Sequence, residues 1–116
     1  MDYKGSCHCG EITFEFTSPE ITEGLRCDCS LCQRKGATMT PFVVSPEDIR
    51  TDWDNENLAT YQFGSCIAEH HFCKKCGIYP FHQTFSFPGQ YRINIGCVEG
   101  VNAINLPTKT FPGSEI

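Results

Sequence analysis

The sequence predicts a mainly β domain, built from short antiparallel strands with little helix. Residues 11–17 alternate polar and apolar side chains with the period of two that is typical of a half-buried strand. Further segments are rich in the β-branched and aromatic residues that strands favour, namely 38–44, 59–63, 70–72 and 91–95. Glycine and proline are scattered as turn residues between these segments. We therefore expect short strands joined by frequent turns.

Two short helical segments are expected between the strands. Ser45 can cap one helical turn that has Pro46 at its first position, and residues 30–35 can form another directly after Cys29. The length of 116 residues suits one domain, so we expect a single domain over residues 1–116. A domain with so small a core usually needs further stabilisation, for example by a bound metal ion or by disulfides.

The composition argues against several classes of partner. Hydrophobic residues make up 40% of the chain and charged residues 20%, and no apolar run approaches the roughly 20 residues of a membrane span. The formal net charge of −5 disfavours nucleic-acid binding. The first residues lack the basic and then apolar stretch of a secretory signal. We expect a cytoplasmic protein with neither a membrane nor a nucleic-acid partner, and the oligomeric state stays open.

Seven of the nine cysteines fall into three tight groups. These groups are Cys7 and Cys9, then Cys27, Cys29 and Cys32, then Cys73 and Cys76. In a cytoplasmic setting such groups favour metal binding over disulfides, and an odd number of cysteines fits disulfide pairing poorly. Seven thiols divide most simply into four and three. Four sulfurs close a tetrahedral zinc site, whereas three leave one coordination position for water or a substrate.

The strongest local signal is the Cys-x-x-Cys motif formed by Cys73 and Cys76. Two intervening residues allow a tight turn to direct both sulfurs at one ion, and Gly77 can adopt the positive φ that ends such a turn. The motif supplies half of a tetrahedral site. Cys7 and Cys9 are the simplest second half, because alternate residues of a strand share a face. We expect these four cysteines to hold a structural zinc ion, which would couple metal binding to folding.

Cys27, Cys29 and Cys32 are spaced so that a strand end and the following turn can place three sulfurs around a second zinc ion. A fourth ligand from a remote position would make this site structural, and the candidates are His8, Cys66, His70, His71, His82 and Cys97. With an open position, the ion can hold an added thiolate or polarise a carbonyl oxygen. Metal binding also lowers the pKa of a thiol from its usual value of about 8.5.

These motifs resemble one known family. The segments Gly5–Gly10, Cys27–Cys32 and Phe72–Gly77 are similar in order and spacing to the glutathione-dependent formaldehyde-activating enzyme (GFA) family, which includes S-(hydroxymethyl)glutathione synthases and centromere protein V-like zinc proteins. The resemblance covers about Gly5 to Gly100 and implies a zinc-stabilised β-tent fold. It implies one structural zinc at Cys7, Cys9, Cys73 and Cys76, and one catalytic zinc at Cys27, Cys29 and Cys32.

Two functions from different classes follow. In the first, the chain is a carbon–sulfur lyase-like zinc enzyme that adds a small thiol such as glutathione to an aldehyde such as formaldehyde, or removes it, with Cys27, Cys29 and Cys32 as its catalytic site. In the second, the same fold is a non-catalytic structural or interaction module. Other candidate residues are assigned simpler roles: Arg34, Lys35 and Arg92 as solvated cations, Cys97 as a small hydrophobe, and His82 as a packing residue.

Overall fold

The computed structural model describes residues 1–115, and Ile116, the last residue of the predicted domain, lies outside the described residues. Three sheets form within this range. They consist of β1 (Asp2–Ser6), β2 (Thr13–Thr17) and β4 (Ile49–Thr51), of β3 (Gly24–Cys27) and β9 (Thr108–Phe111), and of β5 (Leu58–Tyr61), β6 (Glu69–Cys73), β7 (Phe81–Gln83) and β8 (Tyr91–Ile93). The mainly β fold predicted from the sequence is therefore confirmed.

Of the strand predicted over residues 11–17, the part from Thr13 to Thr17 forms, as β2. In β2, Phe14 and Phe16 are buried, whereas the neighbouring threonine and glutamate side chains are exposed. The two phenylalanine rings join Phe81, Ile93 and Ile95 in the main hydrophobic cluster between the sheets. Each buried aromatic side chain of this kind stabilises a fold by about 1.5–3 kcal/mol.

The helical content is low, as predicted. The helix α1 covers Ser30–Lys35, and Pro46–Asp48 forms a 3₁₀ turn (η1) after Ser45. The Ser45 hydroxyl bonds the Asp48 carboxylate at 3.0 Å instead of capping the turn. Further 3₁₀ turns are η2 (Ile95–Cys97), η3 (Ala103–Asn105) and η4 (Gly113–Glu115). None of the helices within residues 1–115 combines the length and the apolarity needed to cross a bilayer.

Three sequence-based expectations are corrected by the structure. The first is the strand over 38–44, where only Met39 and Val44 form isolated bridges. Pro41 lies between them and has no N–H to donate to a strand ladder. The second concerns one strand pair: two of the three sheets are antiparallel as predicted, whereas β3 and β9 run parallel, with Cys27 opposite Phe111. The chain between these two strands is long enough to make the crossover that parallel pairing requires.

The third correction concerns Cys7 and Cys9, which lie in a turn after β1 and not in a strand. Gly10 donates its backbone N–H to the Cys7 carbonyl at 3.2 Å, which closes the turn. The turn brings the two sulfurs to 3.6 Å from each other. Alternate residues of a strand are about 7 Å apart along the chain, so the turn suits a shared ion better than an extended segment would.

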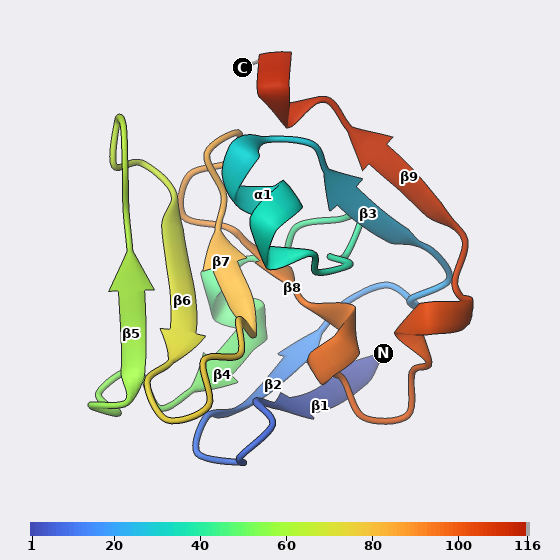
Figure 1. Ribbon diagram of the computed structural model, residues 1–116. Helices are drawn as coiled ribbons and strands as arrows, with labels where there is room; N and C mark the ends of the chain where they lie inside the picture. Colours follow the sequence, from blue (N-terminus) through green and yellow to red (C-terminus); the bar gives the residue numbers. More distant parts are fainter. Residues whose placement is uncertain (116) are drawn as a thin grey trace.

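Figure 1 shows how this arrangement positions the helix. The four-stranded sheet stands on one side, the β3–β9 pair stands on the other, and α1 lies between them. Because α1 directly follows β3, the residues at the end of β3 and in the first turn of α1 meet in this central region.

Candidate functional site

The structure brings Cys7, Cys9, Cys73 and Cys76 together, and we call this group the four-sulfur cluster. All four Sγ atoms lie within 4.8 Å of one another. The sulfurs of Cys9 and Cys73 are 3.7 Å apart. Four sulfurs at tetrahedral angles and about 2.3 Å from a zinc ion would be about 3.8 Å apart. The spacing of these sulfurs therefore fits a zinc ion.

Backbone hydrogen bonds hold the Cys73–Cys76 turn in place. Gly77 donates its N–H to the Cys73 carbonyl at 2.8 Å and adopts a φ of 77°, as the sequence predicted. The N–H of Ile12 also donates to the sulfur of Cys7 at 3.3 Å, which holds this ligand atom in place. Cys7 and Cys73 are buried together with Ile12 in a small apolar cluster. Nearby, Lys75 pairs with Glu11 at 3.4 Å.

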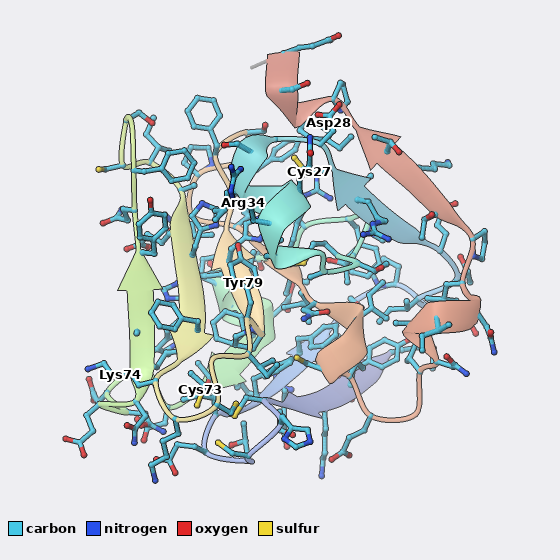
Figure 2. The ribbon with its side chains drawn as sticks, in the orientation of Figure 1. Cys27, Asp28, Arg34, Cys73, Lys74 and Tyr79 are labelled. Carbon is cyan, nitrogen blue, oxygen red and sulfur yellow. The ribbon has the colours of Figure 1, made fainter. Side chains whose placement is uncertain are left out.

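Cys27, Cys29 and Cys32 form a second group, which we call the three-sulfur cluster. Cys27 ends β3, Cys29 is the N-cap residue of α1, and Cys32 lies in its first turn. The Cys32 N–H bonds the Cys29 sulfur at 3.3 Å, so the helix start also orients a ligand atom. All three sulfurs lie within 4.8 Å of one another, and all three residues are half-buried. Figure 2 labels one cysteine from each cluster, with Cys27 in the upper part of the view beside α1 and Cys73 in the lower part.

No fourth ligand joins the three-sulfur cluster within residues 1–115. No other cysteine, histidine, aspartate or glutamate places a ligand atom within 4.8 Å of all three sulfurs. The remote candidates raised by the sequence all fail this test: His8, Cys66, His70, His71, His82 and Cys97. The division of the seven thiols into four and three therefore agrees with the geometry.

The three-sulfur cluster lines a cavity of about 510 Å³, which we call the cysteine cavity. Aromatic side chains from two loops, Phe63 and Phe85, form part of its wall and are partly exposed. The polar lining includes Lys35, His70, His82 and Arg92. A volume of this size suits a small-molecule ligand.

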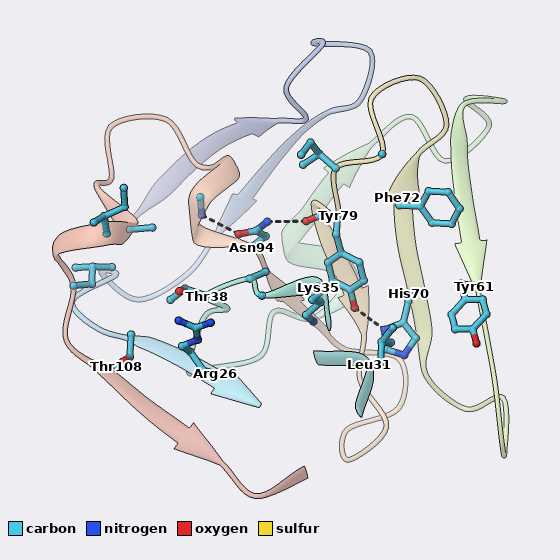
Figure 3. Close-up of a pocket in the computed structure, with 18 residues that line it drawn as sticks. Arg26, Leu31, Lys35, Thr38, Tyr61, His70, Phe72, Tyr79, Asn94 and Thr108 are labelled. Carbon is cyan, nitrogen blue, oxygen red and sulfur yellow. Dashed lines mark hydrogen bonds between the residues drawn. The ribbon is translucent and has the colours of Figure 1, made fainter. Parts of the chain in front are cut away.

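A second cavity of about 890 Å³ adjoins the first and shares Lys35 and His70 with it (Figure 3). Its wall includes Arg26 on β3, Tyr79 before β7 and Asn94 after β8. The amide of Asn94 donates to the Tyr79 carbonyl at 2.8 Å, which ties these two segments together. Lys35 and His70 therefore stand at the boundary between the two cavities.

Lys35 differs from the solvated cation that the sequence suggested. Its Nζ is buried without a hydrogen-bond partner in residues 1–115 and lies 4.1 Å from the centroid of the Tyr79 ring. Burial lowers the pKa of Lys35, and the negative charge of the nearby cysteines, Cys32 first, opposes this effect. The sequence signal that could have revealed this role is helical spacing, because Lys35 lies three residues after Cys32 and so shares its face of the helix.

The other two cations differ from each other in exposure. Arg34 is exposed and donates to the Ser30 carbonyl at 2.8 Å, in agreement with a solvated role. Arg92 is half-buried and donates to the Thr40 carbonyl at 3.0 Å beside the cysteine cavity. Burial lowers its pKa. Cys97 packs against the main hydrophobic cluster, and burial raises the pKa of its thiol to about 11, as suits a small hydrophobe.

Three histidines lie on the four-stranded sheet: the ring centroids of His70 and His82 are 5.6 Å apart, whereas His71 packs against Phe81. Burial lowers the pKa of His70 and of His71 to about 4, and it also lowers the pKa of His82. All three are therefore neutral near pH 7. His71 bonds the Thr60 hydroxyl at 3.0 Å and lines neither cavity, whereas His70 and His82 line the cysteine cavity.

The segment after β9 covers the three-sulfur cluster, which the sequence did not indicate. Ser114 donates its backbone N–H to the Asp28 carboxylate at 2.8 Å. Next to it, Gly113 approaches so closely that an added Cβ would collide with the Cys27 sulfur. Gly113 therefore packs directly against the three-sulfur cluster and forms part of the wall of the cysteine cavity.

Replacing Gly113 by alanine is expected to displace Cys27 and to weaken metal binding at the three-sulfur cluster by about 10–100-fold. Zinc competition with a coloured chelator measures this change. Ser114→Ala is the matched control, because it keeps the backbone N–H that bonds Asp28 and should bind as the unmodified chain does. Equal zinc affinity in the two variants would contradict the packing argument.

Comparisons with known proteins agree with this geometry. The model of the family described as "Glutathione-dependent formaldehyde-activating enzyme" matches residues 2–114. A Halomonas elongata protein named "Putative glutathione-dependent formaldehyde-activating enzyme" is 30% identical over 82 residues, which cover 66% of this chain and 52% of that protein. The chain thus spans about half the length of this curated relative.

A solved structure extends the similarity to the fold. The crystal structure of a Rhodobacter sphaeroides protein superposes with a TM-score of 0.81 at 40% sequence identity. The match covers 91% of this chain and 99% of the other. Together with the family match over nearly every residue, it establishes the relationship: the chain belongs to the glutathione-dependent formaldehyde-activating enzyme family.

Proposed function

We propose that this chain is a zinc-dependent carbon–sulfur lyase-like enzyme that adds a small thiol to an aldehyde, or removes it. The observation that carries the proposal is the unequal pair of clusters: one has four sulfurs, whereas the other has three on the wall of a cavity. Glutathione and formaldehyde are the proposed thiol and aldehyde, because both appear in the name of the family and of the Halomonas relative.

The proposed ligand sets follow the clusters. Cys7, Cys9, Cys73 and Cys76 would hold a structural zinc, and Cys27, Cys29 and Cys32 would hold a catalytic one. A zinc ion with an open position lowers the pKa of an arriving thiol, so that more thiolate is present at neutral pH. We also propose one domain over residues 1–116, supported by the family match over 2–114. A cytoplasmic location stays a prediction.

The residues of the chain supply the surroundings for this chemistry. Phe63 and Phe85 supply apolar wall to the cysteine cavity, next to the proposed reacting atoms. Lys35 places a cation beside the cysteines, where it offsets part of the negative charge of three bound thiolates and a thiolate substrate. Arg92 adds a second cation to the same cavity.

Zinc analysis combined with thiol alkylation tests the proposed sites. We expect two zinc ions per chain, with Cys27, Cys29 and Cys32 alkylated faster than the four structural cysteines. The reaction itself is measured by NMR exchange between glutathione, ¹³C-labelled formaldehyde and their adduct, and the zinc-loaded chain should accelerate this exchange. A single zinc, equal protection of all seven thiols and no acceleration would instead support the non-catalytic module.

A further inference from the structure

The two ring nitrogens of His70 differ in their hydrogen bonding, because only Nδ1 bonds another residue within 1–115. The residue lies on β6, is 7% exposed, and lines both cavities. Its Nδ1 and the Tyr79 hydroxyl are 2.6 Å apart (Figure 3). Tyr79 lines the second cavity and is absent from the wall of the cysteine cavity. The Nδ1 edge of the ring is therefore occupied on the side of the second cavity.

The hydrogen bond also assigns the tautomer of His70. A phenol is a stronger acid than a neutral imidazole, so the Tyr79 hydroxyl donates and Nδ1 accepts. The ring proton then resides on Nε2. Nε2 makes no hydrogen bond to any described residue from 1 to 115. It is also not one of the fully buried polar atoms without a partner, so it stays accessible. Because His70 lines the cysteine cavity and Nδ1 is already occupied, Nε2–H is the ring donor that can serve a ligand there.

Burial and the nearby positive charge of Lys35 keep the His70 ring neutral. Burial and the nearby Lys35 ammonium hold the pKa of His70 at about 4. Burial raises the pKa of Tyr79, so its hydroxyl also keeps its proton. The Lys35 ammonium lies against the Tyr79 ring and near the cysteines, which makes Lys35 a physical link between the histidine–tyrosine pair and the three-sulfur cluster.

We propose that His70 is a catalytic residue whose Nε2–H donates a hydrogen bond to the aldehyde oxygen, and that Tyr79 is the positioning residue that sets its tautomer. This inference rests on the proposed function and deepens it by assigning the group that stabilises the oxygen. A neutral imidazole can polarise a carbonyl in this way without changing its own charge.

The step balances without any further reactant. The thiol loses its proton to solvent water as it ionises. Its sulfur then forms a bond to the carbonyl carbon, and the electron pair of the C=O π bond moves to the oxygen. The His70 N–H stabilises the negative charge that develops there, and the oxygen takes a proton back from water. In the reverse direction the same hydrogen bond stabilises the oxygen while the carbon–sulfur bond breaks.

His70→Phe tests the catalytic role, because phenylalanine keeps a ring of similar volume and removes the donor. We expect kcat for adduct formation to fall about 100-fold, with the zinc content and the KM for glutathione unchanged. His70→Gln, which offers an amide N–H near the position of Nε2, should recover at least part of this loss. The control is His71→Phe, an identical change on the same strand, whose side chain lines neither cavity and should leave kcat unchanged.

Tyr79→Phe tests the positioning role independently. We expect kcat to fall about 10-fold. Long-range ¹H–¹⁵N spectra should show the proton of His70 on Nε2 in the unmodified chain and a mixture of tautomers in the variant. This spectroscopic change would not accompany a purely structural role, and it decides the question even if His70→Phe does not fold.

The possible outcomes separate the two proposals. If the zinc-loaded chain accelerates the exchange and His70→Phe does so equally well, the role of His70 is wrong and the proposed function stands. An unmodified chain whose His70 carries its proton on Nδ1 also overturns the inference. If the chain with two zinc ions gives no acceleration, both proposals fall.

Discussion

Replacing Cys73 by serine is expected to abolish cooperative folding of the domain. Cys73 is fully buried, and its sulfur belongs to the four-sulfur cluster. Structural zinc contributes about 10–16 kcal/mol of binding free energy in small zinc-binding peptides, whereas an entire domain is stable by about 5–15 kcal/mol. If loss of one sulfur ligand releases the zinc ion, the lost binding free energy should therefore be as large as the whole free energy of unfolding of the domain. Circular dichroism during thermal unfolding, together with zinc analysis, measures the result.

The position of the cluster in the chain strengthens this expectation. It joins the turn after β1 to the turn after β6, which are separated by 64 residues at Cys9 and Cys73. An ion held at this point therefore constrains a long loop of the unfolded chain. Cys66→Ser is the control, because Cys66 is exposed and outside both clusters. A Cys73→Ser variant that unfolds cooperatively at the same temperature as this control would show that the cluster does not stabilise the fold.

Replacing Cys32 by serine is expected to have the opposite pattern: activity is lost while folding persists. The change removes one of three sulfurs, so the second ion should leave and the exchange of the glutathione–formaldehyde adduct should slow by about 100-fold or more. Cys27, Cys29 and Cys32 lie within one short segment, so an ion bound there closes only a small loop and contributes less to folding.

The measurements for this variant are the zinc content, the unfolding transition and the NMR exchange rate. We expect one zinc per chain, a cooperative transition and no acceleration of the exchange. Cys97→Ser is the matched control, since Cys97 is also half-buried and takes no part in either cluster. If Cys32→Ser kept the full exchange rate with a single zinc, the three-sulfur cluster would not be the site of the reaction.

Local sequence patterns predicted much of the fold because they describe interactions between near neighbours. The alternation in residues 11–17 led to β2, and the helix predicted over 30–35 has the observed bounds of α1. The strand predicted over 38–44 does not form, because Pro41 has no N–H to donate to a ladder, and only isolated bridges remain at Met39 and Val44. The parallel partner of β3 was not foreseen, because pairing between distant segments leaves no mark in local periodicity.

The cysteine spacing alone separated the seven thiols into four and three, because metal ligands must lie close together and short spacings satisfy this requirement locally. The tertiary structure decided the rest of the site. It showed that no histidine from the remote candidates completes the three-sulfur cluster, and it buried Lys35 against Tyr79. It also placed Tyr79 against His70 and Gly113 against Cys27. These contacts join segments far apart in the chain, so only the packing of the sheets around α1 could determine them.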